Sequence, residues 1–210
     1  MKPAVAHSER GWILIGMAEC CAAKGYEATT TGDICAEAGV SPTSFEELFA
    51  DKGECLGAAM ESLLEEAWRQ LDGVQAPGKS WARELSDGVA ALLSLLSERP
   101  AFARMALIEA PVAGGRAGTL YASGKAALVA QVERGRNQAE NDVPASAGRA
   151  ALAGAEALVV GQILAGKAEQ LGDLAPEVTY MLLAPYMERP ESLRLSPDST
   201  ATRPHLRAVA

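Results

Sequence analysis

The segment from Thr29 to Leu56 constrains the fold of this chain more than any other part of the sequence. Within it, Thr30 and Asp33 form the S/T-x-x-D pattern that caps the beginning of a helix. Ser41 is placed to cap a second short helix, and Pro42 takes its first position, where a missing N–H costs nothing. Two short helices joined by a Gly-Val-Ser turn have the layout of a helix-turn-helix, whose second helix enters the DNA major groove.

The charge of this segment opposes the motif. Residues 1–55 hold four Lys or Arg against nine Asp or Glu, a net charge of −5, and the other residues add −3 to give the total of −8. The second short helix itself carries Glu46 and Glu47. DNA-binding domains usually present a basic surface, because neutralising phosphates releases counterions and supplies much of the affinity. The motif therefore indicates DNA binding, whereas the negative charge of the segment argues against it.

The composition favours an all-α protein. A chain of 210 residues fits one large domain or a small domain fused to a larger one, and 49% apolar residues can bury a substantial core. Alanine is abundant, and strand-like alternation of β-branched residues is hard to find. No apolar run reaches the roughly 18–20 residues that span a bilayer, and the N-terminal residues lack the pattern of a signal peptide. We expect a cytoplasmic protein without a membrane partner.

Hydrophobic spacing and caps predict about nine helices. Three form an N-terminal module, the first from about Ser8 to Lys24 and the next two within the segment described above. The longer helices that follow are expected at 51–71, 80–98, 117–139, 146–171 and 174–187, and a further one begins at Pro100. We therefore expect a helix-turn-helix domain at 1–50, a helical bundle at 51–189 and a disordered tail at 190–210. Pro111 with Gly114 and Gly115 is expected to end the helix that begins at Pro100.

The sequence contains no constellation of catalytic or metal-binding residues. The four cysteines match no zinc spacing, and only His7 and His205 are available to help them. Reduced, partly buried thiols are the main interpretation, with a redox or metal role as the alternative. There is no nucleophile elbow, P-loop or dinucleotide fingerprint. We expect no enzyme activity, no metal and no cofactor.

The chain resembles the TetR family of transcriptional regulators over about 50 residues. The resemblance is carried by Gly25-Tyr26, Thr30, Asp33-Ile34, Ala38-Gly39-Val40-Ser41, Phe45, Phe49, Lys52 and Leu56. It implies a homodimeric repressor whose first three helices bind palindromic operator DNA, released by a small molecule bound in the C-terminal bundle. It also implies a dimer contact through the last two long helices, where Gly154, Ala155, Gly161, Ala165 and Gly166 would allow close approach. Close packing within one subunit is the alternative for these small residues.

The resemblance, with the position of each side chain, indicates candidate DNA-binding residues. Lys52 begins a helix and is expected to contact phosphate, unless it is simply a solvated lysine. The other candidates are Thr30, Ser41, Pro42, Thr43, Ser44 and Glu46. Glu46 departs from the family, in which a tyrosine at this position touches the DNA backbone. Its charge is expected to repel phosphate, or alternatively to accept a hydrogen bond from cytosine.

Bulky side chains in the bundle are candidates to line an effector cavity. They are Trp68, Trp81, Phe102, Met105, Glu109 and Tyr121, and an ordinary core is the alternative for each of the apolar ones. Glu109 interrupts an apolar run, so it needs an ion-pair partner, water or a ligand. We expect an apolar effector, cationic if Glu109 faces the cavity. The alternative function is a TetR-like dimer with weakened or lost DNA binding that serves as a ligand-binding or protein-interaction module.

Overall fold

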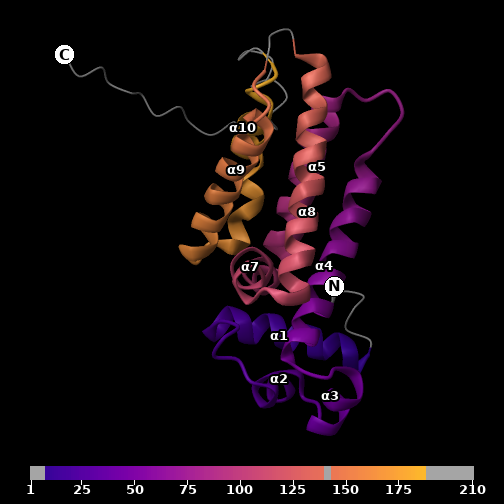
Figure 1. Cartoon of the computed structure of the whole chain (residues 1–210), viewed down its shortest axis with the longest axis vertical. Helices are drawn as coiled ribbons and strands as arrows, with labels where there is room; N and C mark the ends of the chain where they lie inside the picture. The colour runs from indigo at the N-terminus through magenta and orange to yellow at the C-terminus, as the bar shows by residue number, and fades with distance from the viewer. Residues whose placement is uncertain (1–7, 140–142, 188–210) are drawn as a thin grey trace, which may run out of the picture.

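The computed structural model describes residues 8–139 and 143–187, and these residues contain helices and no strand. Three short helices form a module at one end of the molecule, and the longer helices run away from it as a bundle (Figure 1). The all-α prediction is confirmed. Residues 100–113 form one continuous helix, so the described residues contain nine helices. The expected tail at 190–210 lies outside the described residues.

The helix-turn-helix module, α1 to α3, is built from helices with well-defined caps. Helix α1 (Glu9–Lys24) begins at the Ser8 cap, whose Oγ accepts a hydrogen bond from the Gly11 N–H. Helix α2 (Thr31–Ala38) has a complete capping box and ends at a left-handed glycine. Helix α3 (Pro42–Leu48) begins after its serine cap with proline at its first position. The ends predicted from the caps are confirmed within a residue or two.

Helix α4 (Lys52–Val74) joins the module to the bundle. Residues 55–60 of α4 are all buried, and the helix packs against α1 at one end and against α5 (Trp81–Glu98) and α8 (Gly115–Glu133) along its length. Figure 1 shows it rising from the module to the α4–α5 loop at the far end of the molecule. One rigid element therefore spans both parts of the chain.

The helix that begins at Pro100 continues past Pro111 and ends at Gly114, within the Pro111, Gly114 and Gly115 stop that the sequence predicted. It runs through α6 (Pro100–Arg104), a π turn (Met105–Glu109) and α7 (Ala110–Ala113) before two glycines with positive φ, Gly114 and Gly115, end it. Proline lacks an N–H, and its ring collides with the carbonyl four residues earlier in a regular α-helix. The widened π turn, in which the Ala110 N–H bonds to the Met105 carbonyl, relieves that collision.

The remaining elements close the far side of the bundle. Helix α8 continues into a 3-10 turn (Arg134–Gln138), and α9 (Ala147–Leu164) is followed by a 3-10 segment (Ala168–Leu174) and α10 (Ala175–Leu183). The prediction that one helix runs from 146 to 171 is wrong. Gly166 has a φ of +73°, which breaks the helix after Leu164.

Two hydrophobic clusters divide the core. The first joins α1, α2 and α3 to the lower half of α4 and to Met105, and the second lies between α5, α8, α9 and α10. All four cysteines are free and buried in the first cluster, and burial raises the pKa of the Cys21 and Cys55 thiols to about 12. Such thiols stay protonated, which supports a packing role for these two cysteines.

Candidate DNA interface and effector cavity

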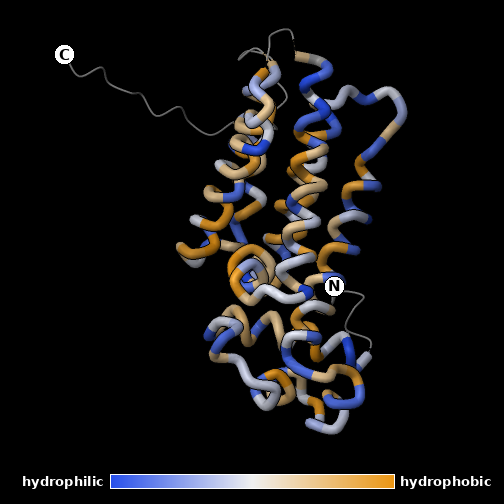
Figure 2. The backbone as a smooth tube through the Cα atoms, in the orientation of Figure 1, coloured by the Kyte–Doolittle hydropathy of each residue, from blue (hydrophilic) through white to orange (hydrophobic). Residues whose placement is uncertain are grey.

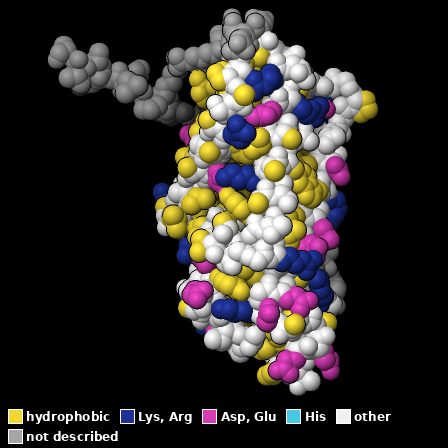
Figure 3. All heavy atoms as spheres, in the orientation of Figure 1, with side chains coloured by type: hydrophobic (Ala, Val, Ile, Leu, Met, Phe, Trp, Pro, Cys, Tyr) yellow, Lys and Arg dark blue, Asp and Glu magenta, His cyan; other side chains and the backbone are white. Residues whose placement is uncertain are grey.

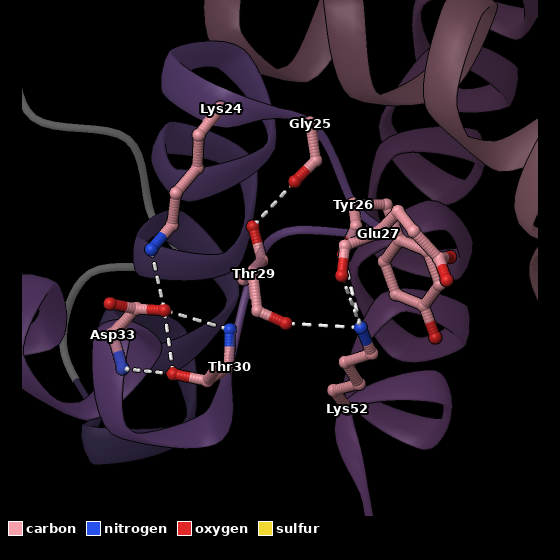
Figure 4. A network of polar contacts seen from close by, with 8 residues as sticks. All are labelled: Lys24, Gly25, Tyr26, Glu27, Thr29, Thr30, Asp33 and Lys52. Atoms are coloured by element: carbon pink, nitrogen blue, oxygen red, sulfur yellow. Dashed lines mark hydrogen bonds and ion pairs between the residues drawn. The ribbon is translucent and has the colours of Figure 1, made fainter.

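The start of α2 is held by a compact polar network. The Asp33 carboxylate accepts hydrogen bonds from the Thr30 N–H at 2.8 Å and the Thr30 hydroxyl at 2.6 Å. The Lys24 ammonium lies 2.5 Å from the same carboxylate oxygen (Figure 4). These contacts hold the pKa of the Asp33 carboxyl well below its ordinary value of 3.8, and the contact with Lys24 contributes most. The Thr30 hydroxyl therefore serves as a cap, although it remains exposed.

Helix α3 presents a short polar face at its N-terminus. The Ser41 Oγ accepts a hydrogen bond from the Ser44 N–H at 3.0 Å, and Pro42 and Thr43 beside it are exposed. Phe45 is buried and anchors the opposite face, so the rotation of α3 is fixed. The exposed face is thus the one that carries hydroxyl groups suited to phosphate or base edges.

Acidic side chains follow directly on that face. Glu46 and Glu47 are both exposed, and Figure 3 shows Asp and Glu side chains gathered at the end of the molecule occupied by the module. Arg10 is a nearby exposed cation, but its guanidinium lies 5.7 Å above the Phe49 ring. The charge conflict seen in the sequence persists at the surface of the module.

Lys52 is more deeply engaged than the sequence suggested. Its ammonium donates hydrogen bonds to the carbonyl oxygens of Tyr26 at 3.1 Å, Glu27 at 3.2 Å and Thr29 at 3.0 Å (Figure 4). It also lies 4.5 Å from the centre of the Tyr26 ring. An ammonium has three N–H donors, so all are used. In this structure Lys52 holds the loop between α1 and α2, and a phosphate would have to share or displace those contacts.

Glu109 connects the bundle to the same loop. Its carboxylate accepts a hydrogen bond from the Tyr26 N–H at 2.8 Å and lies 3.8 Å from the Arg104 guanidinium. Gly25, with a φ of +81°, brings the loop close enough that an added Cβ would lie 3.4 Å from a Glu109 oxygen. Glu109 does not line the cavity: of the partners that the sequence left open, it has an ion-pair partner, and this carboxylate belongs to the contact between module and bundle.

The bundle encloses a cavity of about 260 Å³, close to the lower end of the range of roughly 300–1,000 Å³ found for ligand pockets. Its wall is mostly leucine, valine and tryptophan from α4, α5, α8, α9 and α10. Trp68 and Trp81 line it, as the sequence predicted. Phe102, Met105, Glu109 and Tyr121 do not.

The side chains outside the cavity wall have other partners. Phe102 and Met105 pack in the first hydrophobic cluster, because α6 lies against α1. Tyr121 hydrogen-bonds to Glu156, and Lys125 pairs with the same carboxylate. Glu156 does line the cavity, and the sequence analysis missed it because it interrupts an alanine-rich helix without any motif.

Helix α9 exposes an apolar face. Of the described helices it alone has the length and hydropathy of a membrane-spanning segment, and only 22% of its 18 residues are buried. In Figure 2 hydrophobic colours dominate its length. No charged side chain interrupts the exposed positions between Arg149 and Lys167, which are Ala150, Ala153, Ala157, Leu158, Gly161, Leu164, Ala165 and Gly166. Contiguous apolar surface of this kind is typical of a protein interface.

Comparison with known proteins agrees with the geometry of the module. Residues 13–59, from within α1 to within α4, match the model of the family described as bacterial regulatory proteins, tetR family. The N-terminal module is a TetR-family module. A search of curated protein sequences gave no match.

Solved structures of TetR-like regulators have the same fold over most of the chain. SmeT, the repressor of the multidrug efflux pump SmeDEF of Stenotrophomonas maltophilia, aligns with a TM-score of 0.66 at 18% identity, covering 95% of this chain and 98% of SmeT. FadR of Bacillus subtilis, solved with stearoyl-CoA, aligns with a TM-score of 0.67 at 17% identity, covering 84% of this chain and 98% of FadR. At these identities the similarity establishes a TetR-like fold, and function has to be argued from the site.

Proposed function

We propose that this TetR-like protein is a cytoplasmic, ligand-responsive transcriptional regulator, a repressor that binds palindromic operator DNA as a homodimer. The observation that carries the proposal is the capped, exposed N-terminus of α3 on a module that the Glu109–Tyr26 hydrogen bond ties to a cavity-containing bundle. The solved proteins of similar fold are described as regulators, which is consistent with this role and with the absence of an enzyme activity.

The proposed DNA contacts come from the N-termini of α2, α3 and α4. Thr43 is the candidate for base edges, and the backbone N–H groups at the helix starts would bind phosphate. Lys52 would act mainly by fixing the loop that positions α2. The remaining candidates, Thr30, Ser41, Pro42, Ser44 and Glu46, lie at or beside the same helix starts.

The homodimer would form through α9 and α10. The exposed apolar face of α9 is uninterrupted by charge, and a second copy would bury it. A two-fold axis through this face, parallel to the bundle, would place the two copies of α3 at the same end of the dimer. For palindromic operators the two recognition helices need to lie about 34–36 Å apart, one helical turn of DNA. The domains would be residues 1–50 for DNA and 51–189 for effector binding and dimerisation.

Two elements would carry the effector signal to the module. Helix α4 has Lys52 at one end and the cavity-lining Trp68 sixteen residues later, a span of about 24 Å at 1.5 Å per residue. The π turn has Leu107 in the cavity wall and Glu109 on the Tyr26 N–H. An effector can shift the DNA-binding equilibrium only if it binds the two arrangements of these elements with different affinity.

Selection of genomic DNA fragments by the full chain, followed by footprinting, tests the DNA function. We expect recovered fragments to share an inverted repeat whose half-sites are one helical turn or a multiple apart. Thr43→Ala should weaken binding, whereas Thr119→Ala, an exposed threonine on α8, should not. Recovery of fragments without a common repeat would argue against an operator-binding regulator.

One observation favours the alternative, a ligand-binding or protein-interaction dimer with weakened DNA binding. Glu46 and Glu47 are exposed on α3, and the Lys52 ammonium is already saturated by carbonyl oxygens. The same selection separates the two functions, because the alternative predicts effector binding and dimerisation without enrichment of any DNA sequence.

A further inference from the structure

The cavity has a polar rim at one end and an apolar interior. Its exposed lining residues are Asp72 and Gln75 near the C-terminus of α4 and Arg134 just beyond α8. The deeper wall is apolar and largely buried, and includes Val89, Leu93, Val132, Val159 and Leu182. A ligand that fills this space would place its apolar part inside and any charged group at the rim.

Charged groups in the rest of the wall are already paired. Arg134 hydrogen-bonds to Glu84 at 3.4 Å and to the Gln131 side chain at 2.9 Å. Glu156 accepts hydrogen bonds from Tyr121 and Lys125. An ionised ligand group placed deep in the cavity would lose its hydration without gaining a free counter-charge.

Asp72 differs from these residues. Among the described residues its carboxylate has no hydrogen-bond or ion-pair partner, and the cations nearest in sequence pair elsewhere, Arg69 with Glu66 and Lys79 with Asp87. Trp68 lies four residues earlier on α4, so the two side chains are neighbours on the face that lines the cavity. The C-terminus of α4 follows at Val74, whose carbonyl already accepts a hydrogen bond from the Lys79 ammonium at 2.7 Å.

We propose that the effector is an apolar molecule with one positively charged head group, held at the rim by the Asp72 carboxylate and the Trp68 indole. A carboxylate and an aromatic face both attract a cation. An anionic head group would instead meet three carboxylates, those of Asp72, Glu84 and Glu156, and a single guanidinium that is already paired. The inference rests on the proposed role of this cavity as the effector site.

Three probes with the same decyl chain test the proposal on the full-length protein. Tryptophan fluorescence is titrated with decyltrimethylammonium, 1-decanol and decanoate, each below its aggregation concentration. We expect the affinity to follow the order cationic, neutral, anionic. Asp72→Asn should weaken binding of the cationic probe about threefold, the size of an exposed ion pair, because the contact with Trp68 remains, and it should leave binding of 1-decanol unchanged.

The matched control is Asp173→Asn, which removes an exposed carboxylate that does not line the cavity. It should leave all three affinities as they are. The proposal is overturned if decanoate binds as tightly as the cationic probe, if Asp72→Asn leaves the affinity of the cationic probe unchanged, or if no probe binds. Operator binding is measured on the same protein samples. If the protein binds its operator, such a failure concerns the ligand class alone. If it does not, the proposed regulator function fails as well.

Discussion

The helix-turn-helix module and the bundle satisfy their polar groups to different degrees. In the module, the α2 start, the α1–α2 loop and the Lys52 ammonium are linked by hydrogen bonds between 2.6 and 3.2 Å. In the bundle, four buried side-chain atoms have no partner among the described residues: Arg104 Nε, Glu133 Oε1, Thr179 Oγ1 and Tyr186 OH. None of the buried, unpartnered atoms found belongs to the module.

This difference matches the different tasks proposed for the two parts. A satisfied network specifies one arrangement, which suits a module that must fit a rigid DNA groove. A cavity and unpaired polar atoms lower local stability, and elements that move on ligand binding are drawn from such regions. The two parts meet at the Glu109–Tyr26 hydrogen bond and along α4.

The largest effect is expected from Lys52→Met, which removes the centre of the module network. Loss of three charge-assisted hydrogen bonds, discounted for partial exposure, should lower the free energy of unfolding by about 2 kcal/mol. DNA binding should then weaken for all sequences. Urea unfolding and DNA titration measure both effects.

Lys24→Met is the control for that variant, because the Lys24–Asp33 pair is partly exposed and screened by solvent, so its loss should lower the stability much less. If Lys52 were only a phosphate contact, its variant would keep the stability of the native chain. The slope of log K against log salt would then flatten by about one unit.

Glu109→Leu should have the next largest effect, because it leaves the Tyr26 N–H without its acceptor. A part-buried donor left unpaired costs about 1–3 kcal/mol, so the module should separate more easily from the bundle. Faster hydrogen exchange at the Tyr26 amide is the expected signature. Glu109→Gln keeps an accepting oxygen and should restore slow exchange. Equal exchange rates in both variants would show that Glu109 does not hold the module to the bundle.

Glu46→Tyr tests whether the acidic surface of the module opposes DNA. If the charge repels phosphate, the variant should bind operator DNA about tenfold more tightly per half-site at low salt, and less so at high salt. Glu47→Tyr, at the next position of α3, distinguishes a specific position from a general change in charge. Weaker binding by the Glu46 variant would favour a hydrogen bond from Glu46 to a base.

The smallest effect concerns acid stability. The pKa of Asp33 is lower in the folded chain than its ordinary value of 3.8, so its stabilising contribution is complete above that pH and is lost as the pH falls below it. Asp33→Asn should therefore reduce the acid sensitivity of unfolding only below about pH 4. A difference between the two proteins that is constant from pH 7 to pH 3 would contradict this assignment.

The module could be predicted from sequence because its signals are local. A cap such as Thr30 with Asp33 acts over three residues, and α3 follows from Ser41 and Pro42. The cavity could not be predicted in the same way. Trp68 and Trp81 were identified by size, but Glu156 reaches the cavity only through the pairing of α8 with α9.

Glu109 also shows what could not be predicted from the sequence. The sequence indicated that a charge in an apolar run needs a partner, and the structure supplies one in Arg104. Its contact with the Tyr26 N–H joins residues 83 positions apart, and it depends on the π turn before Pro111. Such long-range contacts are fixed by tertiary packing, which local spacing does not encode.

The salt dependence of operator binding tests the central claim, that an acidic module with a preserved α3 N-terminus still binds DNA. The dimer is titrated onto a recovered operator and onto a scrambled sequence at 50 and 200 mM salt. With about four phosphate contacts per dimer, the affinity for the operator should fall roughly a hundredfold between these conditions. It should exceed the affinity for the scrambled sequence at both salt concentrations. Equal, micromolar or weaker binding to both sequences would contradict the account.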